Sequence, residues 1–262
     1  MSRVRTMIDK EWAEVFRNKL VLFTVGLLPL LFMVLPLVEL AATRQAGASA
    51  MSRAPGNIAQ ICQAQGLSDS ECLQGFLVNQ FMLFFLLLPL AIPVTIASYS
   101  IVGEKTTHSL EPLLATPAST TEIILGKSLA AALPAIGATW LSFAVFVVAA
   151  RFFVVSDRVY GVITNPMWLA AMALVAPLLT VFSVNVAIVI SSRVSDPRAA
   201  EQLGMLVMIP LIGLFFAQIF GLVALNLTSM VLFAVAMLVI DAALVPVGVR
   251  LFQRETILTR WH

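Results

Sequence analysis

The sequence predicts an all-α polytopic membrane protein with six transmembrane helices. The 262 residues are 60% hydrophobic and 11% charged, with a mean hydropathy of +0.97, and soluble domains do not have this composition. The apolar residues also occur in long uncharged runs, and a helix needs about 20 apolar residues to cross a bilayer core. Both observations make the lipid bilayer the expected solvent of most of the chain.

Six apolar runs are long enough to cross the membrane. With the segments that connect them, they are expected to form a single transmembrane domain over residues 1–262. The expected spans are 20–38, 76–102, 128–150, 167–190, 203–225 and 230–249. The connecting parts are an interfacial helix 1–19, outer loops 39–75 and 151–166, cytoplasmic segments 103–127 and 191–202, an outer hairpin tip 226–229 and a cytoplasmic tail 250–262. The tip is placed at 226–229 because this polar tetrad interrupts an uncharged stretch that is too long for one span.

The distribution of basic residues predicts that both termini are cytoplasmic. With the N-terminus inside, the cytoplasmic segments hold 12 of the 16 Lys and Arg residues and the outer segments hold 4, as the positive-inside rule requires. The run 20–38 exceeds the apolar core of a signal peptide, which is about 7 to 15 residues. We therefore expect the first span to be retained.

The residues before the first span form an amphipathic pattern. Apolar side chains recur at spacings of three and four, with charged residues on the opposite face: Val4, Met7, Ile8, Trp12, Val15 and Phe16. We expect a helix on the inner membrane surface with Trp12 at the interface. The alternative is a solvated leader.

The first outer segment contains both cysteines of the chain, Cys62 and Cys72. An oxidising compartment would permit a disulfide between them. Spacing alone does not bring two sulfurs together, so two unpaired thiols remain the alternative.

The cytoplasmic segment 103–127 reads GEKTTHSLEPLLATPASTTEIILGK. Ser109 is a candidate cap for a short helix that Pro117 would end. One face of that helix carries Leu110, Leu113 and Leu114. An exposed leucine stripe predicts a protein partner, and an ordinary amphipathic turn on the membrane surface is the alternative.

A second helix is expected to follow directly and to lead into the third span. Ser119 and Glu122 have the spacing of a capping box. The tripeptide Gly126-Lys127-Ser128 mimics the end of a phosphate-binding loop, but Thr121 stands where the first glycine is needed. We therefore interpret Gly126 as a site of close helix packing.

On these residues the chain resembles the ATP-binding-cassette type-2 permease family. The matching motifs are Gly103-Glu104, Ser109-Leu110-Glu111, Leu113-Leu114, Pro117 and Gly126-Lys127, with Lys10-Glu11 and Arg17-Asn18-Lys19 near the amino end. The basic, acidic, basic and glycine run that usually follows Glu104 is replaced by Lys105-Thr106-Thr107-His108.

The resemblance implies the membrane-spanning permease subunit of an exporter. In that family the segment is a coupling helix that rests in a groove of a separate soluble ATPase subunit, which binds ATP and Mg. The leucine stripe would be buried against the ATPase, with Glu104 and Glu111 anchoring at the rim. It also implies a second permease copy, identical or paralogous, in a prokaryotic inner membrane.

The sequence carries no catalytic constellation of its own. Its two histidines, His108 and His262, do not cluster with cysteines or carboxylates, so no metal site is expected. No nucleic-acid partner and no cofactor bound by this chain are expected either.

Asp241 is an ionisable residue within the sixth expected span. A charge there is costly and commonly faces protein or water. It is a candidate for lining the substrate path or binding a cation, and a structural role, protonated or hydrogen-bonded to a group such as Asn185, is the alternative. Two other functions stay open for the whole chain: an ion-gradient-driven secondary transporter and a non-catalytic membrane scaffold.

Overall fold

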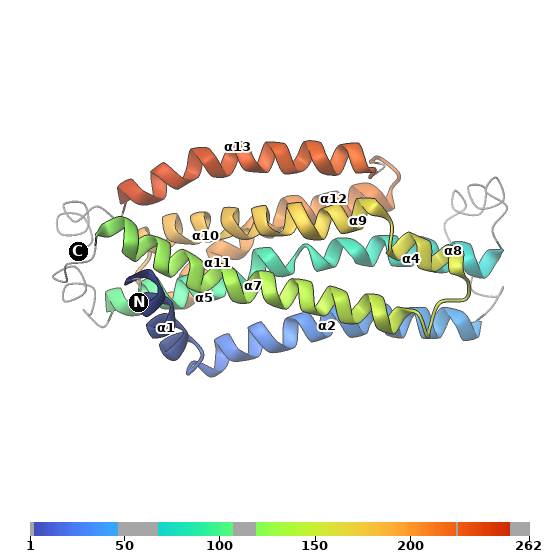
Figure 1. The fold of residues 1–262 in the computed structure, drawn as a ribbon, viewed down its shortest axis with the longest axis horizontal. Helices are drawn as coiled ribbons and strands as arrows, with labels where there is room; N and C mark the ends of the chain where they lie inside the picture. Colours follow the sequence, from blue (N-terminus) through green and yellow to red (C-terminus); the bar gives the residue numbers. More distant parts are fainter. Residues whose placement is uncertain (1–2, 47–67, 107–118, 224, 252–262) are drawn as a thin grey trace.

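Long apolar helices lie side by side in an elongated bundle (Figure 1). The computed structural model describes residues 3–46, 68–106, 119–223 and 225–251, and this part of the chain contains helices and turns without strands. Six helical stretches in it are long and apolar enough to cross a membrane: 21–44, 70–106, 121–150, 157–193, 197–219 and 227–248. The predicted fold class is confirmed.

The helices are α1 (Arg3–Val15), α2 (Lys19–Ala46), α4 (Asp69–Phe85), α5 (Leu88–Thr106), α7 (Thr120–Ala150), α8 (Asp157–Ile163), α9 (Pro166–Ala170), η2 (Ala171–Val175), α10 (Ala176–Arg193), α11 (Pro197–Met205), η3 (Leu206–Met208), α12 (Ile209–Ile219) and α13 (Leu227–Leu251). We call the end of the bundle that carries α1 the α1 end and the opposite end the α8 end. The start of α1 and the end of α13 lie at the α1 end (Figure 1).

Several spans are broken by local changes of helix type. The second span consists of α4 and α5, separated at Leu86 and Leu87. In the fourth, the π-helical turn η2 precedes α10, which has Pro177 at its start. In the fifth, the 3₁₀ turn η3 precedes α12 with Pro210 at its start. Proline lacks the N–H that would continue the preceding helical ladder, so these breaks fall where the sequence removes a donor.

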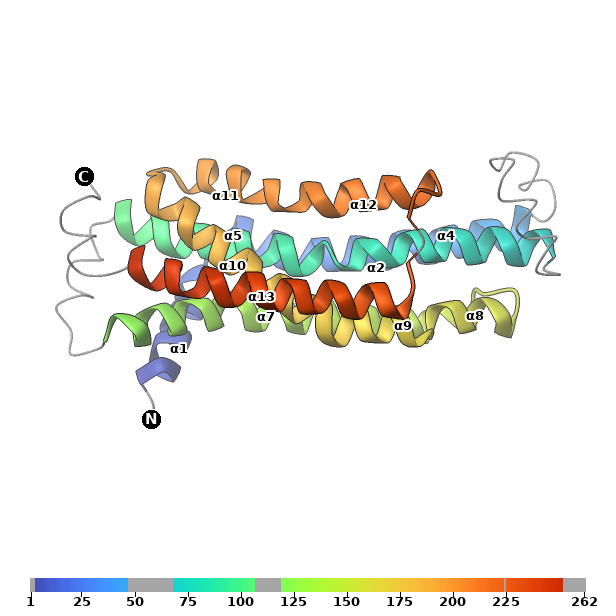
Figure 2. The same ribbon diagram turned by 90° about the horizontal axis from the view of Figure 1, so that it is seen from above.

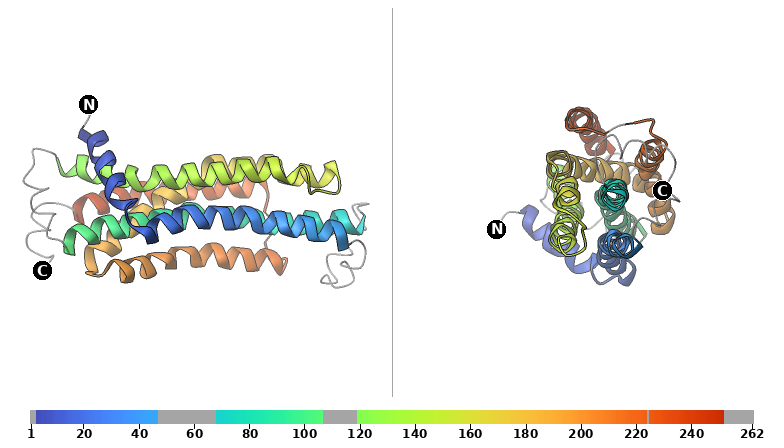
Figure 3. Two further views of the ribbon diagram at one scale, coloured as in Figure 1. Left: turned by 90° about the horizontal axis from the view of Figure 1, so that it is seen from below. Right: turned by 90° about the vertical axis from the view of Figure 1, so that its right-hand side faces the viewer.

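Helix α5 is the most enclosed of the spans. Viewed end-on, the α4–α5 span lies within the bundle, among α2, α7, α10 and α12 (Figure 3), and α5 packs against α7, α10 and α11. Two polar contacts join it to its neighbours: Ser183 Oγ donates to the Leu90 carbonyl at 2.6 Å and Thr95 Oγ1 donates to Glu201 Oε1 at 2.7 Å. These contacts satisfy buried hydroxyls that would otherwise be costly in an apolar interior.

The helices are longer than the sequence predicted at the α8 end. α2 continues to Ala46 rather than ending at residue 38, and α4 begins at Asp69 rather than at residue 76. The start of α4 has an unforeseen cause, since Ser68 and Glu71 form a capping box. Residues 39–75 are therefore not one outer loop.

The fourth and fifth spans also differ from the prediction. The expected loop 151–166 contains α8. The expected loop 191–202 contains the start of α11, where the side chain of Asp196 caps the helix by accepting from the backbone N–H groups of Arg198 and Ala199. The expected tip 226–229 is instead the start of α13, because Asn226 Oδ1 accepts from Ser229 N at 2.8 Å. The chain reverses earlier, near Gly221, whose φ of 69° is in the region that glycine favours.

The α8 end is fastened by a buried amide. Gln74 of α4 is fully buried; its Nε2 donates to the Leu40 carbonyl at 2.9 Å and its Oε1 accepts from Val155 N at 3.0 Å. Nearby, Arg44 donates to the Phe152 carbonyl at 2.7 Å. These bonds join α2 and α4 to the turn between α7 and α8. An ion pair of Arg151 with Asp157 lies exposed at the same end.

Candidate functional site

Helix α1 packs across the ends of α5 and α7 (Figures 1 and 3). The indole Nε1 of Trp12 donates to the Ala130 carbonyl at 2.9 Å. Met7 lies over Gly126, where an added Cβ would come within 2.6 Å of Met7 Cγ. Only a glycine permits this approach without a shift, so the prediction that Gly126 is a site of close helix packing is confirmed. The apolar face of α1 covers protein.

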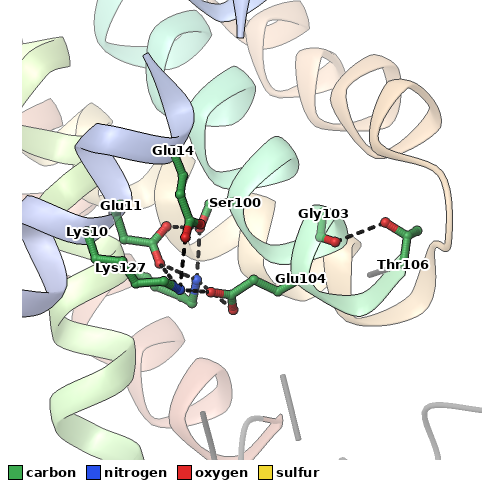
Figure 4. A network of polar contacts seen from close by, with 8 residues as sticks. All are labelled: Lys10, Glu11, Glu14, Ser100, Gly103, Glu104, Thr106 and Lys127. Atoms are coloured by element: carbon green, nitrogen blue, oxygen red, sulfur yellow. Dashed lines mark hydrogen bonds and ion pairs between the residues drawn. The ribbon is translucent and has the colours of Figure 1, made fainter. Parts of the chain in front are cut away.

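A buried lysine, Lys127, connects α1, α5 and α7 (Figure 4). Lys127 of α7 is 5% exposed. Its Nζ lies 2.7 Å from Glu11 Oε1 of α1, 2.9 Å from Glu104 Oε2 of α5, and 3.0 Å from Ser100 Oγ of α5. Three contacts match the three donors of an ammonium group, which is the condition for burying such a charge.

Lys10 completes the charge balance. Its Nζ lies 2.6 Å from Glu104 Oε1, and Glu14 of α1 lies 3.7 Å away at the rim. The Ser100 hydroxyl donates a hydrogen bond to the Glu11 carboxylate. We call Lys10, Glu11, Ser100, Glu104 and Lys127 the ion network. It pairs two cations with two carboxylates, and Glu11 and Glu104 are 1% and 5% exposed.

The network shifts the titration of the two α1 residues that belong to it. Burial by itself raises the pKa of Glu11, but the charge of Lys127 and hydrogen bonds from Lys127 and Ser100 outweigh it and leave the pKa below its ordinary value. Burial lowers the pKa of Lys10, and its hydrogen bond to Glu104 and the nearby carboxylates outweigh this and raise it. Both groups are therefore charged across the neutral range.

The network joins the two sides of the segment 107–118. Glu104 lies in the last turn of α5 before this segment, and Lys127 lies early in α7 after it. Ser119 caps α7: its Oγ accepts from Glu122 N at 3.2 Å, and its own N donates to Glu122 Oε2 at 2.8 Å. The predicted capping box is confirmed. Lys105 also donates to the Val194 carbonyl at 3.4 Å, which connects α5 to the end of α10.

A small cavity adjoins the network. It has about 10 Å³ of room and is lined by Ala97, Ser100, Ile101, Lys127, Ser128, Val184 and Ile188. This is close to the least volume that holds one water molecule. The described residues contain no cluster of His, Cys, Asp and Glu that could hold a metal.

The predicted site residues have different outcomes. Ser109, Leu110, Glu111, Leu113, Leu114 and Pro117 lie outside the described residues, as does Cys62. Cys72 is buried on α4, and its bond to Cys62 stays a prediction. Glu104 differs from expectation: it is buried and bound to lysines of its own chain, so it does not stand at an exposed rim. Asp241 is buried on α13.

The sequence reasoning missed how these charges belong together. Ser100 carried no signal, whereas Lys127 did, since a lysine followed by a long apolar run requires a counter-charge. Lys10 and Glu11 entered as a family motif without a structural role. The sequence does place both acids and bases beside the expected spans, but it does not indicate which acid meets which base.

No curated protein matches the sequence. The family described as ABC-2 family transporter protein matches residues 5–244. This match covers nearly all of α1, the ion network, the first five spans and most of the sixth, and it spans most of the chain. The protein therefore belongs to the ABC-2 transporter family.

Proposed function

We propose that this chain is the membrane-spanning permease subunit of an ATP-driven exporter. Two copies, or this chain and a paralogue, would form the substrate path between them. Separate soluble ATPase subunits would bind ATP and Mg and dock at the α1 end, which we place in the cytoplasm. Membership of the ABC-2 family and the excess of basic residues in the inner segments support this arrangement.

The observation that carries the proposal is the contact of Glu104 with Lys127 across the segment 107–118. A force applied to that segment from the cytosol would reach α5 and α7 at residues that are already joined. Through Glu11 and Lys10 it would also reach α1, which leads into α2. Closure of an ATPase could thus move three spans together rather than bend one.

Glu104 and Glu111 then have different roles. Glu111, with the leucines, remains a candidate contact for the ATPase. Glu104 is a positioning residue, because both of its carboxylate oxygens face lysines of the same chain. The buried charges stay compensated while α1, α5 and α7 move as one unit.

The experiment is reconstitution of the chain with its ATPase in liposomes. Leu113→Glu with Leu114→Glu should abolish both co-purification of the ATPase and ATP-dependent efflux, because charge would be placed in a buried interface. The control is Thr121→Glu, which adds a carboxylate on the exposed first turn of α7, where a helix start favours it. Each single leucine variant, Leu113→Glu or Leu114→Glu, matches it in added charge.

Efflux that survives the leucine substitutions would reject the coupling role. Transport by the chain alone, driven by a proton or sodium gradient, would instead favour a secondary transporter. An intact membrane protein that binds partners but moves no substrate under either energy source would favour a scaffold.

A further inference from the structure

Asp241 is a buried carboxylate without a hydrogen-bond partner among the described residues. It is 4% exposed, and neither carboxylate oxygen has a partner there. It lies near the middle of α13, on the same face as four residues that are also buried: Met230, Ala234, Met237 and Gly248. The pairing with Asn185 that the sequence suggested is not formed, since the Asn185 amide nitrogen is also unpartnered.

No charged side chain among the described residues pairs with Asp241. α13 packs against α10, α9, η2 and, more slightly, α7. The ionisable residues of those helices are Glu122 and Lys127 near the start of α7 and Arg193 at the end of α10. Lys127 is occupied by the ion network, and Arg250 stands near the end of α13 itself. A carboxylate at this depth would be an uncompensated charge, which an apolar interior penalises unless a proton or another cation neutralises it.

The seam between α10 and α13 is formed by an outer helix of the bundle. α13 lies at the edge of the bundle (Figures 1 and 2), and large apolar side chains on its outward face are exposed. Gly248 faces Asn185, with Asn185 Oδ1 3.7 Å from the position of an added Cβ. Gly248 and Asn185 thus lie in the seam, and Asp241 and Asn185 both carry unpartnered polar atoms. Met230 and Met237 lie on the same buried face of α13 as Asp241.

We propose that Asp241 binds the positively charged group of a lipophilic organic cation in this seam. The proposal rests on the proposed exporter function, and the seam would be a site where substrate binds before it reaches the path between the two copies. On binding, the carboxyl O–H bond breaks, the proton leaves to water, and the carboxylate and the organic cation form a neutral pair. A bare inorganic cation needs several oxygen ligands, and the neighbours of Asp241 on its face are apolar or thioether side chains. An organic cation needs one counter-charge and an apolar surface.

The test is equilibrium binding to the full chain in lipid nanodiscs. The probe is radiolabelled tetraphenylphosphonium, and tetraphenylborate, which has the same shape and the opposite charge, is the comparison. Asp241→Asn should weaken phosphonium binding at least tenfold and leave borate binding unchanged or tighter. Asp241→Glu should keep the preference for the cation. Proton release on phosphonium binding should disappear in Asp241→Asn.

Glu201→Gln is the matched control, because Glu201 is a carboxylate of another span that accepts a hydrogen bond from Thr95. It should bind phosphonium as the unchanged chain does. Equal phosphonium affinity in Asp241→Asn, equal loss of both probes, or displacement of phosphonium by sodium but not by choline would each overturn the proposal. Binding is measured without ATP, so the leucine variants, which test ATP coupling, should keep it.

Discussion

At the α1 end the side chains that join the helices are charged and buried, whereas at the α8 end the buried joint is a neutral amide and the ion pair is exposed. Lys127 and its two carboxylates are each at most 5% exposed. In contrast, the side chains of Arg151 and Asp157 are 53% and 85% exposed. The same kind of ion pair thus occurs in opposite environments within one molecule.

This difference in burial predicts different responses to mutation. A buried ion pair contributes little net stability, but removal of one partner leaves an uncompensated charge. Replacing a buried amide side chain leaves the backbone groups that it bound without partners, and this costs less free energy of unfolding. An exposed pair is solvated on both sides and screened by salt. Substitutions at the α1 end are therefore expected to destabilise the protein more than substitutions at the α8 end.

The largest effect is expected for Lys127→Met. The substitution leaves Glu11 and Glu104 without their shared counter-charge and should destabilise the protein by about 3–5 kcal/mol. Thermal unfolding in detergent, followed by circular dichroism, measures it. Adding Glu11→Gln and Glu104→Gln to Lys127→Met should recover much of the loss, because no buried charge then remains unpaired. An unchanged unfolding temperature in the single variant would contradict the burial of this charge.

A smaller loss is expected for Gln74→Leu at the α8 end. It removes the bonds to the Leu40 carbonyl and to Val155 N and should cost about 1–3 kcal/mol. Gln80→Leu on the same helix is the control. Gln80 is also buried, but its Oε1 has no partner among the described residues, so its replacement should be less harmful. If both variants lose the same stability, the bonds of Gln74 do not fasten this end.

Acidification should weaken the α1 end selectively. The pKa of Glu11 is lowered in the folded protein, so its contribution is present above the unfolded pKa of about 4.3 and is lost as pH falls through the lower folded value. Lys10 has a raised pKa, so its contribution is present below the unfolded pKa of about 10.4 and is lost as pH rises through the higher folded value. Both contributions are present between these limits.

The measurement is the unfolding temperature as a function of pH in detergent. Glu11→Gln should flatten the acid side of the curve, because the group that titrates has been removed. Asp157→Asn at the α8 end should leave the acid side unchanged, since Asp157 is exposed and contributes no buried charge. An equal effect of both substitutions would mean that acid acts on the whole surface rather than on the network.

The features that the sequence could predict are those encoded within one segment. Apolar length and charge distribution placed six spans, and the Ser119–Glu122 spacing located the start of α7. Local chemistry was also misread where a helix signal lay inside a presumed loop, as with Ser68 before α4 and Asp196 before α11. Polar caps look like loop residues when the helix that they begin is not expected.

The ion network could not be derived in the same way because its members are far apart in the chain. Lys127 and Glu11 are 116 positions apart, and Lys10 and Glu104 are 94 apart. Which acid meets which base depends on how α1 crosses α5 and α7, and that crossing depends on the close contact of Met7 with Gly126. A motif can mark these residues as important, but three-dimensional packing decides that they neutralise one another.

The smallest effect is expected for Arg151→Ala. Arg151 forms an exposed ion pair with Asp157 and lies over the Tyr160 ring at 5.0 Å from its centroid, so water and salt already weaken the interaction. The unfolding temperature should not change measurably at low or at high salt, and the Arg151→Lys variant should behave in the same way. Instability close to that of Lys127→Met would show that charge, rather than burial, makes the α1 end sensitive. The contrast between the two ends would then need another cause.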